Sequence, residues 1–531
     1  MQKQDQAAAD ALELARLGYK QEFKRAFSPI HVFALVFSIF GLFSSISSVL
    51  VYALPNGGPV AMVWGWGVCS FFILLVTMSL AELGSAAPTS GGLYYWSFKF
   101  ASPRWRRLIS WIVGYSNTIG LVAGVASTEW GCAVQLMAAV SIGSGQTWSA
   151  TTGQTYAVFL LLLFLHAATT SLTTSVVAHL QTIYVVLNIV LCLAIIVALP
   201  VATPAEFKNN ASYAFTGFVN YSGWTNGFAF ILSFLAPLWT ISGFDSSLHI
   251  SEETNNARIA VPLGLVGATA LAGVMGWAIN VVLAFNMGQD IEGLLDSPIG
   301  QPMAAILLNS FGQKGMLAIW SIVVVVQYMV GMSSLVASSR QTFAFARDGG
   351  LPFSGFLYRV NPRTQTPIRC AFAVAFSSAL LGLLAFAGDA ATSALFELGV
   401  VGLYIAYMVP IACRFAGRKA WVPGPFDLGR MGLPVAAVSL LWLIFGITIL
   451  IFPTSPAPDA PDMNYTVVVL AAWLALCLGY YYLPRYGGVH WFKGPIANID
   501  IGEDETIAKS EDPTKGAVDT STSSIDDGEK L

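Results

Sequence analysis

The chain has 531 residues, of which 55% are hydrophobic and only 10% are charged, and its mean hydropathy is +0.66. A soluble protein carries about 25% charged residues, so much of this surface must face something other than water. The net charge of −3 gives no reason to expect a nucleic-acid partner. The composition therefore excludes an ordinary soluble domain and predicts an all-α integral membrane protein within a lipid bilayer.

Twelve apolar segments follow one another along the chain, and each is long enough to cross a bilayer core about 30 Å thick. They lie near residues 30–53, 59–85, 107–140, 154–176, 180–200, 226–249, 262–286, 316–339, 369–388, 392–413, 432–453 and 465–484. The third is long enough to be strongly tilted or to extend beyond the membrane. We therefore expect about twelve transmembrane helices joined by short loops.

Two polar tails flank these segments. Residues 1–29 include a basic stretch, which is expected either to lie on the anionic inner leaflet or to lead into the first helix. Residues 485–531 are predicted to form a disordered, acidic tail, because the sequence beyond 496 is rich in Ser, Thr and Asp and poor in apolar residues. Lys509, Lys515 and Lys530 in that tail are candidate modification sites.

Basic residues in the loops predict the orientation, because short cytoplasmic loops are enriched in Lys and Arg. With an inside N-terminus, the predicted cytoplasmic residues are Lys20, Lys24, Arg25, Lys99, Arg104, Arg106, Arg107, Arg258, Arg340, Arg347, Arg359, Arg363, Arg369, Arg414, Arg418, Lys419 and Arg430. Of the 26 basic residues, only Lys208 and Lys314 are expected on the opposite side. Both termini are therefore predicted to be cytoplasmic.

Three N-glycosylation sequons agree with this orientation. They begin at Asn210, Asn220 and Asn464, in loops that the basic residues place outside. These three asparagines are therefore the predicted glycan sites.

The six cysteines lie within or at the edges of apolar segments, and no pair has Cys-x-x-Cys spacing. They are Cys69, Cys132, Cys192, Cys370, Cys413 and Cys477. This pattern predicts buried free thiols rather than a disulfide framework or a zinc site. No cofactor and no metal site are expected.

Small polar residues cluster near the middle of two segments that lie five segments apart. Gly41-Leu42-Phe43-Ser44-Ser45-Ile46-Ser47-Ser48 occurs in the first, and Ser242-Gly243-Phe244-Asp245-Ser246-Ser247 occurs in the sixth. Such clusters are typical of helices whose backbone is broken to bind a solute at the midplane of a transporter. Ordinary close packing of small residues is the alternative interpretation.

Four acidic residues lie within apolar segments. A carboxylate at the centre of a membrane helix costs about 2.5–3.5 kcal/mol on insertion scales, so Asp245 needs a substrate amine, a proton or a polar partner. Glu129 in the third segment and Glu397 in the tenth raise the same question. Glu82, near the inner end of the second, is expected to gate transport or to pair with an inside arginine.

Histidines and aromatic residues add further candidates. His166 and His179 are interpreted either as proton relays or, preferably, as hydrogen-bonded core residues, and His249 lies close to Glu252 and Glu253. Trp239, Phe244 and Tyr328 are candidates for closing over a ligand, although most aromatic residues in such a chain pack in the core.

Several stretches resemble the amino acid–polyamine–organocation superfamily, and specifically its fungal amino acid/choline branch. They are GYKQEFKRAFSPI, GGPVAMVWGW, AELGSAAPTSGGLYYW, PLWTISGFDSSLHISEETNNARIAVP and SSRQTFAFARDGGLP. The resemblance implies a LeuT-like fold with inverted repeats over residues 30–200 and 226–413, followed by two peripheral helices over 432–484. It also implies that a substrate carboxylate binds the broken first helix and that its amine faces the broken sixth helix.

The substrate-binding residues implied by the resemblance are Phe43, Ser44, Ser45, Trp239, Thr240, Ile241, Ser242, Gly243, Phe244 and Asp245. Glu82, Glu129, Glu397 and Tyr328 are candidates for coupling or gating. Phe43-Ser44-Ser45 departs from the Gly-Ser-Gly type of motif found in many relatives, so serine hydroxyls are expected to share in binding. The fifth helix lacks the buried lysine of some proton-coupled relatives, which leaves the coupling ion open, with H⁺ expected.

We therefore expect a secondary transporter rather than an enzyme: an alternating-access permease for amino acids or related amines such as GABA. A choline or polyamine permease of the same family is the alternative, and a nutrient sensor with the same fold is a further one. A membrane-embedded transferase would need a catalytic cluster near one interface, and the sequence offers none that is convincing. The plasma membrane is the expected location, with the vacuolar membrane left open.

Overall fold

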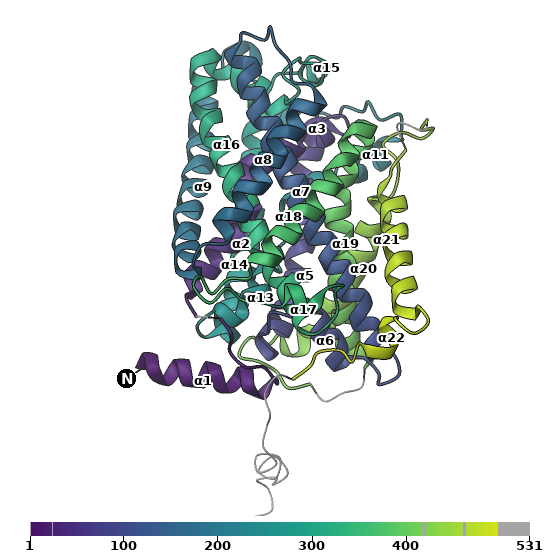
Figure 1. The fold of residues 1–531 in the computed structure, drawn as a ribbon. Helices are drawn as coiled ribbons and strands as arrows, with labels where there is room; N and C mark the ends of the chain where they lie inside the picture. Colours follow the sequence, from purple (N-terminus) through teal and green to yellow (C-terminus); the bar gives the residue numbers. More distant parts are fainter. Residues whose placement is uncertain (1, 24, 418–420, 460–462, 498–531) are drawn as a thin grey trace, which may run out of the picture.

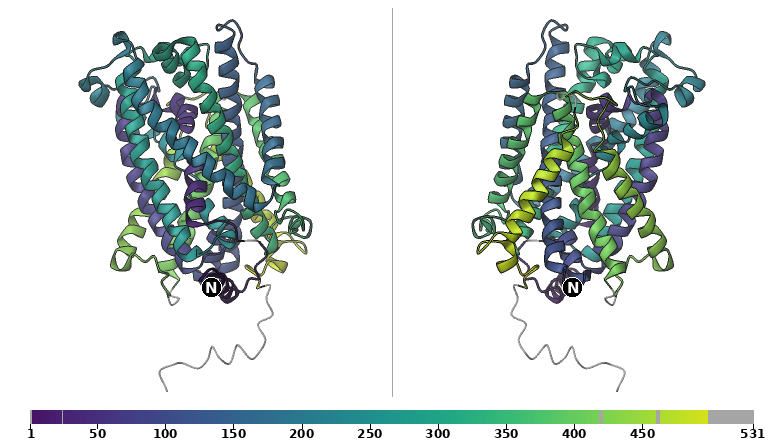
Figure 2. Two further views of the ribbon diagram at one scale, coloured as in Figure 1. Left: turned by 90° about the vertical axis from the view of Figure 1, so that its left-hand side faces the viewer. Right: turned by 90° about the vertical axis from the view of Figure 1, so that its right-hand side faces the viewer.

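A computed structural model describes residues 2–23, 25–417, 421–459 and 463–497, and this part of the chain is helical without a β-strand. Its long helices run side by side between two ends of the molecule (Figures 1 and 2). Within the described residues, ten helices are long and apolar enough to cross a membrane, and two shorter apolar ones cover Asn226–Thr240 and Thr466–Tyr482. The predicted all-α membrane fold is confirmed, and the two shorter helices lie where the sixth and twelfth segments were expected.

The first five membrane segments lie within residues 29–202. They comprise α2 (Pro29–Phe40) with α3 (Leu42–Ala53), α4 (Gly58–Val60) continuing through a π-helical turn into α5 (Trp66–Ala86), α7 (Arg106–Gly143), α8 (Thr152–Thr170) and α9 (Thr174–Ala202). The short helix α6 (Gly92–Phe100) connects the second segment to the third.

The remaining segments follow a loop that contains α10 (Ala211–Thr216). They comprise α11 (Asn226–Leu232) with α12 (Leu235–Thr240) and α13 (Ser246–His249), then α14 (Ala257–Asn286), α16 (Pro302–Arg347), α18 (Ile368–Gly382), α19 (Asp389–Ala416), α20 (Gly432–Ile449) and α21 (Thr466–Tyr482). The short helices α15 (Ile291–Leu295), α17 (Ser354–Leu357) and α22 (Gly488–Trp491) lie in loops or beyond the last segment.

Two membrane segments are interrupted, as the small-residue clusters predicted. Gly41 separates α2 from α3 in a left-handed conformation, with φ of 45° and ψ of 48°. In the sixth segment, α12 ends at Thr240 and α13 begins at Ser246, and Gly243 between them has φ of 72°. A Cβ on Gly243 would lie 3.1 Å from the Ile39 side chain, so the two interruptions are adjacent in space.

The eighth segment is longer than its predicted range of 316–339. Its helix, α16, spans 46 residues and is kinked at Gly312, where φ is 65° and ψ is 175°. Its last turns stay helical although they contain Arg340 and Arg347, because each guanidinium is buried against a carboxylate, on Glu253 and Glu252 respectively. A prediction from hydropathy alone ends this segment too early, because it counts the two arginines as charged and ignores their pairing with carboxylates.

The long helix α7 lies inside the bundle and packs against α8, α16, α18 and α19. In Figure 1, α9 lies along one flank and α20 and α21 along the other. Large apolar side chains on these outer helices are exposed, including Val197, Leu441 and Leu476. An apolar exterior of this kind matches a lipid environment rather than water.

The N-terminal segment packs more deeply than its polar composition suggests. α1 (Gln2–Arg16) extends along the lower end of the molecule in Figure 1, and Tyr19, Phe23 and Phe27 after it are buried in the bundle. The two interpretations of residues 1–29, as a leaflet-bound stretch or a polar lead-in, therefore both miss this burial. The segment is buried because three aromatic side chains, each four residues from the next, lie within its charged sequence.

The predicted disordered tail over 485–531 begins too early. Residues 485–497 contain α22 and the buried Phe492, whose ring lies 5.1 Å from that of Trp111. Lys509, Lys515 and Lys530 lie outside the described residues, as does all of 498–531.

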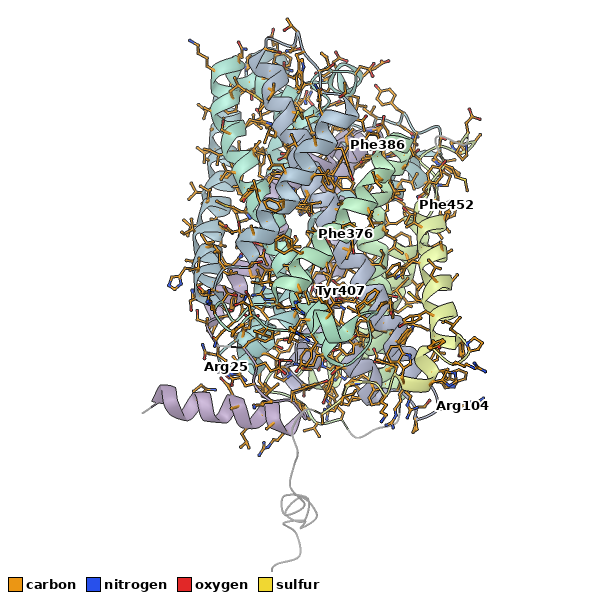
Figure 3. The ribbon with its side chains drawn as sticks, in the orientation of Figure 1. Arg25, Arg104, Phe376, Phe386, Tyr407 and Phe452 are labelled. Carbon is orange, nitrogen blue, oxygen red and sulfur yellow. The ribbon has the colours of Figure 1, made fainter. Side chains whose placement is uncertain are left out.

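Basic side chains gather at the end of the molecule that carries α1, α6 and α22, which we call the basic end. Arg25 and Arg104 lie there in Figure 3, whereas Phe386 and Phe452 lie toward the opposite end. Lys24, Arg418 and Lys419 are outside the described residues.

Candidate functional site

A small cavity lies where the two interruptions meet. Its lining comes from both broken segments and from α7, α16 and α19: Ile39, Ser45, Gly120, Leu121, Gly124, Thr128, Trp239, Thr240, Ser242, Gly243, Ser334, Ala337, Ser338 and Leu403. None of these residues is ionisable. The cavity measures about 40 Å³, enough for about three water molecules. The central site is therefore small in this structure.

One wall of the cavity is the start of α3. The first backbone bond of this helix runs from the Ser45 N–H to the Gly41 carbonyl oxygen, over 2.8 Å. The N–H groups of a helix's first turn lack intrahelical acceptors and carry positive partial charge. The Ser44 hydroxyl donates back to the Gly41 carbonyl, so it serves the break itself, whereas Ser45 faces the cavity. This wall suits an anionic group.

The opposite wall is the end of α12. Its last carbonyl groups lie at the negative end of the helix dipole. The Trp239 indole N–H donates to the Ser127 hydroxyl over 2.9 Å, and its ring lies 4.9 Å from that of Phe396. The buried Thr240 hydroxyl has no hydrogen-bond partner in the part of the chain that the structure describes. This wall offers acceptors for an amine.

Five of the ten implied substrate residues line the cavity: Ser45, Trp239, Thr240, Ser242 and Gly243. The other five, Phe43, Ser44, Ile241, Phe244 and Asp245, are buried nearby but do not line it. Nine lining residues were missed, among them Gly120, Gly124 and Thr128 on α7. Their spacing of four residues was the available signal, because it puts small side chains on one face of a helix.

Asp245 is fully buried and is held by protein side chains. The Tyr407 hydroxyl donates to its Oδ1 over 2.6 Å, the Asn117 amide donates to its Oδ2 over 3.2 Å, and Nε2 of His249 lies 3.0 Å from Oδ2. Figure 3 shows Tyr407 within the bundle, toward the basic end. These partners offset the cost of a buried carboxylate without a substrate.

Glu129 forms a second buried pair, with Nδ1 of His166 on α8. The Tyr328 ring of α16 lies 4.0 Å from the His166 ring. Neither the second oxygen of Glu129 nor Nε2 of His166 has a hydrogen-bond partner among the described residues. The pair joins three helices behind the cavity without lining it. His179, by contrast, is exposed, and its Nδ1 faces a carbonyl of its own helix.

The other two acidic candidates tie helices together at opposite ends. Glu82 pairs with Arg414, so its partner is an arginine as expected, and it accepts the Leu428 N–H over 2.7 Å. Glu397 accepts the Thr466 hydroxyl over 2.6 Å, which fastens the start of α21 to α19. Neither residue lines the central cavity.

Two buried ion pairs close the molecule between the cavity and the basic end. Arg340 donates to Glu253 over 2.9 Å, and Arg347 donates to both oxygens of Glu252 over 2.8 and 3.0 Å. Burial alone would raise the pKa of Glu252, but the Arg347 guanidinium outweighs it and lowers that pKa. We call these two pairs the inner closure.

The three sequons differ in accessibility. Asn210 is exposed and accepts the Tyr213 N–H, which leaves its own amide nitrogen free to carry a glycan. The amide nitrogen of Asn464 is buried and donates to the Leu450 and Phe452 carbonyls. This burial disfavours a glycan at Asn464. At Asn220 the amide nitrogen donates to the Trp224 carbonyl.

The six cysteines are free, as predicted, and all but Cys413 are buried. Buried thiols in apolar surroundings are inert, so these residues act as packing groups.

Comparison with known proteins identifies the family. The model of the amino acid permease family matches residues 27–473. The chain belongs to this family. The permease is 36% identical over 515 residues to the GABA-specific permease of Saccharomyces cerevisiae, covering 94% of this chain and 90% of the relative.

Two further relatives agree. An uncharacterized amino-acid permease of Schizosaccharomyces pombe is 38% identical over 487 residues, which cover 92% of this chain and 88% of the relative. The amino-acid permease BAT1 of Arabidopsis thaliana is 33% identical over 505 residues, 92% and 96% of the two chains. The permease is therefore a multi-pass membrane transporter and not an enzyme, and its resemblance to the amino acid–polyamine–organocation superfamily is confirmed.

Proposed function

We propose that this permease is a secondary active, alternating-access transporter of small zwitterionic amino acids, with GABA as the leading substrate and H⁺ as the coupling ion. The observation that carries the proposal is the uncharged cavity between two broken helices. Opposed helix ends place positive partial charge on one wall, where the Ser45 hydroxyl also lies, and negative partial charge on the other, which complements a carboxylate and an amine. The name of the yeast GABA-specific relative supports the choice of GABA.

The same cavity disfavours the alternative substrates. Choline has no carboxylate for the start of α3, and its quaternary ammonium group is best bound by a cage of several aromatic rings. Trp239 is the one aromatic residue in the lining. A polyamine carries two or more positive charges, and the lining has no carboxylate to balance them.

The repeat and membrane assignments remain part of this proposal. The breaks in the first and sixth segments support inverted repeats over 30–200 and 226–413, with 432–484 peripheral. The basic end supports a cytoplasmic location for both termini. We place the protein in the plasma membrane, which fluorescence microscopy of a tagged chain tests against the vacuolar membrane.

Uptake into transporter-deficient yeast tests the substrate assignment. Labelled GABA, choline, putrescine and several amino acids are compared at different external pH values, with and without an uncoupler. We expect GABA to accumulate, unlabelled choline not to compete with it, and the uncoupler to abolish accumulation. Choline uptake without GABA uptake, by chains that reach the surface, refutes the assignment.

A matched pair of serine variants tests the cavity itself. Ser45 faces the cavity, whereas the Ser47 hydroxyl is bonded to the Phe43 carbonyl of its own helix. A hydrogen bond to a charged group contributes about 1.5–3 kcal/mol, so Ser45→Ala should weaken GABA affinity roughly 10-fold to 100-fold. Ser47→Ala should change it little. Equal effects of the two variants would contradict this placement of the substrate.

A further inference from the structure

Asp245 and His249 form a buried pair whose hydrogen bonds require one shared proton. Nδ1 of His249 lies 3.0 Å from the Ser90 carbonyl oxygen, which can only accept, so Nδ1 must carry a hydrogen. Nε2 of His249 lies 3.0 Å from Oδ2 of Asp245. A proton is therefore needed between Nε2 and Oδ2 as well, on whichever atom it resides. With that proton the pair is neutral overall, and without it the pair carries one buried negative charge.

The groups around this pair leave it with one shared proton and provide no other positive charge to neutralise it. The Asp245 carboxylate is met from α19 by the Tyr407 hydroxyl and from α7 by the uncharged Asn117 amide. On the side of α16, Arg340 and Arg347 are committed to Glu253 and Glu252. No basic side chain other than His249 bonds to Asp245 within the described residues.

The pair is also connected to the inner closure through a single residue. Ser90 accepts from His249 at its carbonyl, and its N–H donates to Oε1 of Glu252 over 3.0 Å. Glu252 in turn holds Arg347 by two bonds. A continuous chain of hydrogen bonds thus runs from the break in the sixth segment to the inner closure.

Loss of the proton must break one link of this chain. A neutral histidine has one N–H, but here two acceptors, Asp245 and Ser90, face its two ring nitrogens. Once the proton leaves, either the contact with Asp245 or the contact with Ser90 becomes a repulsion between lone pairs. The state of the pair therefore governs the contact between α13 and Ser90, the residue whose N–H also holds Glu252.

We propose that Asp245 and His249 form the proton-binding site of this transporter, and that the bound proton holds the inner closure shut. The inference deepens the proposed function, on whose H⁺ coupling it rests. It gives Asp245 a role different from the amine contact implied by the resemblance, in keeping with its absence from the cavity lining. Because the pair lies directly after the lining residue Gly243, substrate binding and proton binding act on one short segment.

The test uses purified full-length protein in liposomes that contain a pH-sensitive dye. Counterflow of labelled GABA measures binding and exchange, and dye fluorescence measures proton movement driven by a GABA gradient. We expect His249→Gln to keep counterflow within about fivefold of wild type and to lose GABA-driven proton movement, because glutamine cannot take up a proton. His179→Gln, at an exposed histidine, should keep both.

Two outcomes overturn the inference. One is GABA-driven proton movement by His249→Gln at the wild-type ratio to GABA. The other is loss of that movement in His166→Gln alone, which assigns the proton to the Glu129 pair instead. If His249→Gln does not fold, Asp245→Asn decides in the same assay: proton movement retained overturns the inference, and counterflow without proton movement supports it.

A substrate-independent measurement separates this inference from the proposed function. Absence of GABA counterflow by the wild type would reject the substrate assignment but not the proton site. The unfolding midpoint in detergent then tests the site, because the amide introduced by Asp245→Asn would donate permanently to His249 as the protonated aspartate does. We expect removal of the proton at high pH to lower the midpoint of the wild type more than that of Asp245→Asn, and equal losses refute the inference.

Discussion

Gly41→Ala should destabilise the permease through two separable effects. The residue has φ of 45°, a conformation that costs an L-amino acid with a side chain about 1–2 kcal/mol. An added Cβ would also lie 1.9 Å from Cγ2 of Val330 on α16, and overpacking of this kind costs about 1–3 kcal/mol. The sum is a loss of about 2–5 kcal/mol.

A double-mutant cycle separates the two effects. Val330→Ala removes the methyl group that the new Cβ would meet, but it leaves the backbone conformation as it is. The double variant should therefore recover about 1–3 kcal/mol relative to the sum of the single variants. Gly153→Ala is the control, since a Cβ there meets nothing within 4 Å.

Unfolding midpoints of purified protein in detergent, followed by intrinsic fluorescence, provide the readout. Gly41→Ala should unfold well below the wild type and Gly153→Ala close to it, and the double variant should be more stable than the summed losses of Gly41→Ala and Val330→Ala predict. A Gly41→Ala protein as stable as the wild type would show that the first segment is not broken at this residue. A double variant no better than additive would show that Val330 is not the neighbour that resists the added methyl group.

Three further outcomes follow from buried groups near the two ends of the bundle. Glu82→Gln leaves the buried Arg414 guanidinium without its carboxylate partner and should lower the free energy of unfolding by about 3–5 kcal/mol. Arg414→Gln in the same chain should restore part of this loss. Burial raises the pKa of Asp348 to about 6, above its ordinary value of 3.8. The folded state then binds the proton more tightly than the unfolded state, so stability falls by about 3 kcal/mol as pH rises from about 4 to about 6, and Asp348→Asn should abolish this fall in a pH series of unfolding midpoints. Asn210→Gln should remove any glycan detected by glycosidase treatment, whereas Asn464→Gln should remove none and should destabilise the protein by the loss of two buried hydrogen bonds.

Local sequence was enough to predict the membrane helices and the position of the breaks. Apolar runs report burial in lipid directly, and Ser242-Gly243 marks an interrupted helix because these residues stabilise helices weakly. The break in the first segment lies at Gly41, the first residue of its predicted cluster, and Phe43, Ser44 and Ser45 belong to the following helical turn. The sequence pattern could not show which residue forms the break, because Gly41 and the helical turn after it belong to one cluster rich in small polar residues.

The site was predicted only in part because its partners are distant in sequence. Asp245 was recognised as a buried charge, but Asn117 and Tyr407, which hold it, lie 128 and 162 residues away. The cavity walls on α7 and α16 likewise consist of small residues that resemble ordinary packing positions. Residue type shows that a polar group needs a partner, and only the packing of helices shows which partner it has.

Asp348 is the place where the beginning and the end of the chain meet. Its Oδ2 accepts the hydroxyls of Tyr19 and Tyr94, over 3.0 and 2.7 Å, and its Oδ1 accepts the Ile496 N–H over 3.3 Å. During synthesis Tyr19 cannot contact Asp348 until residue 348 has been made. Ile496 is added almost 150 residues later. The contacts around Asp348 are thus completed only after Ile496 has been made. A chain that stops before Ile496 lacks this N–H donor to Oδ1 of Asp348, and a quality-control protease would find uncovered the apolar surface, including Trp111, that Phe492 normally covers.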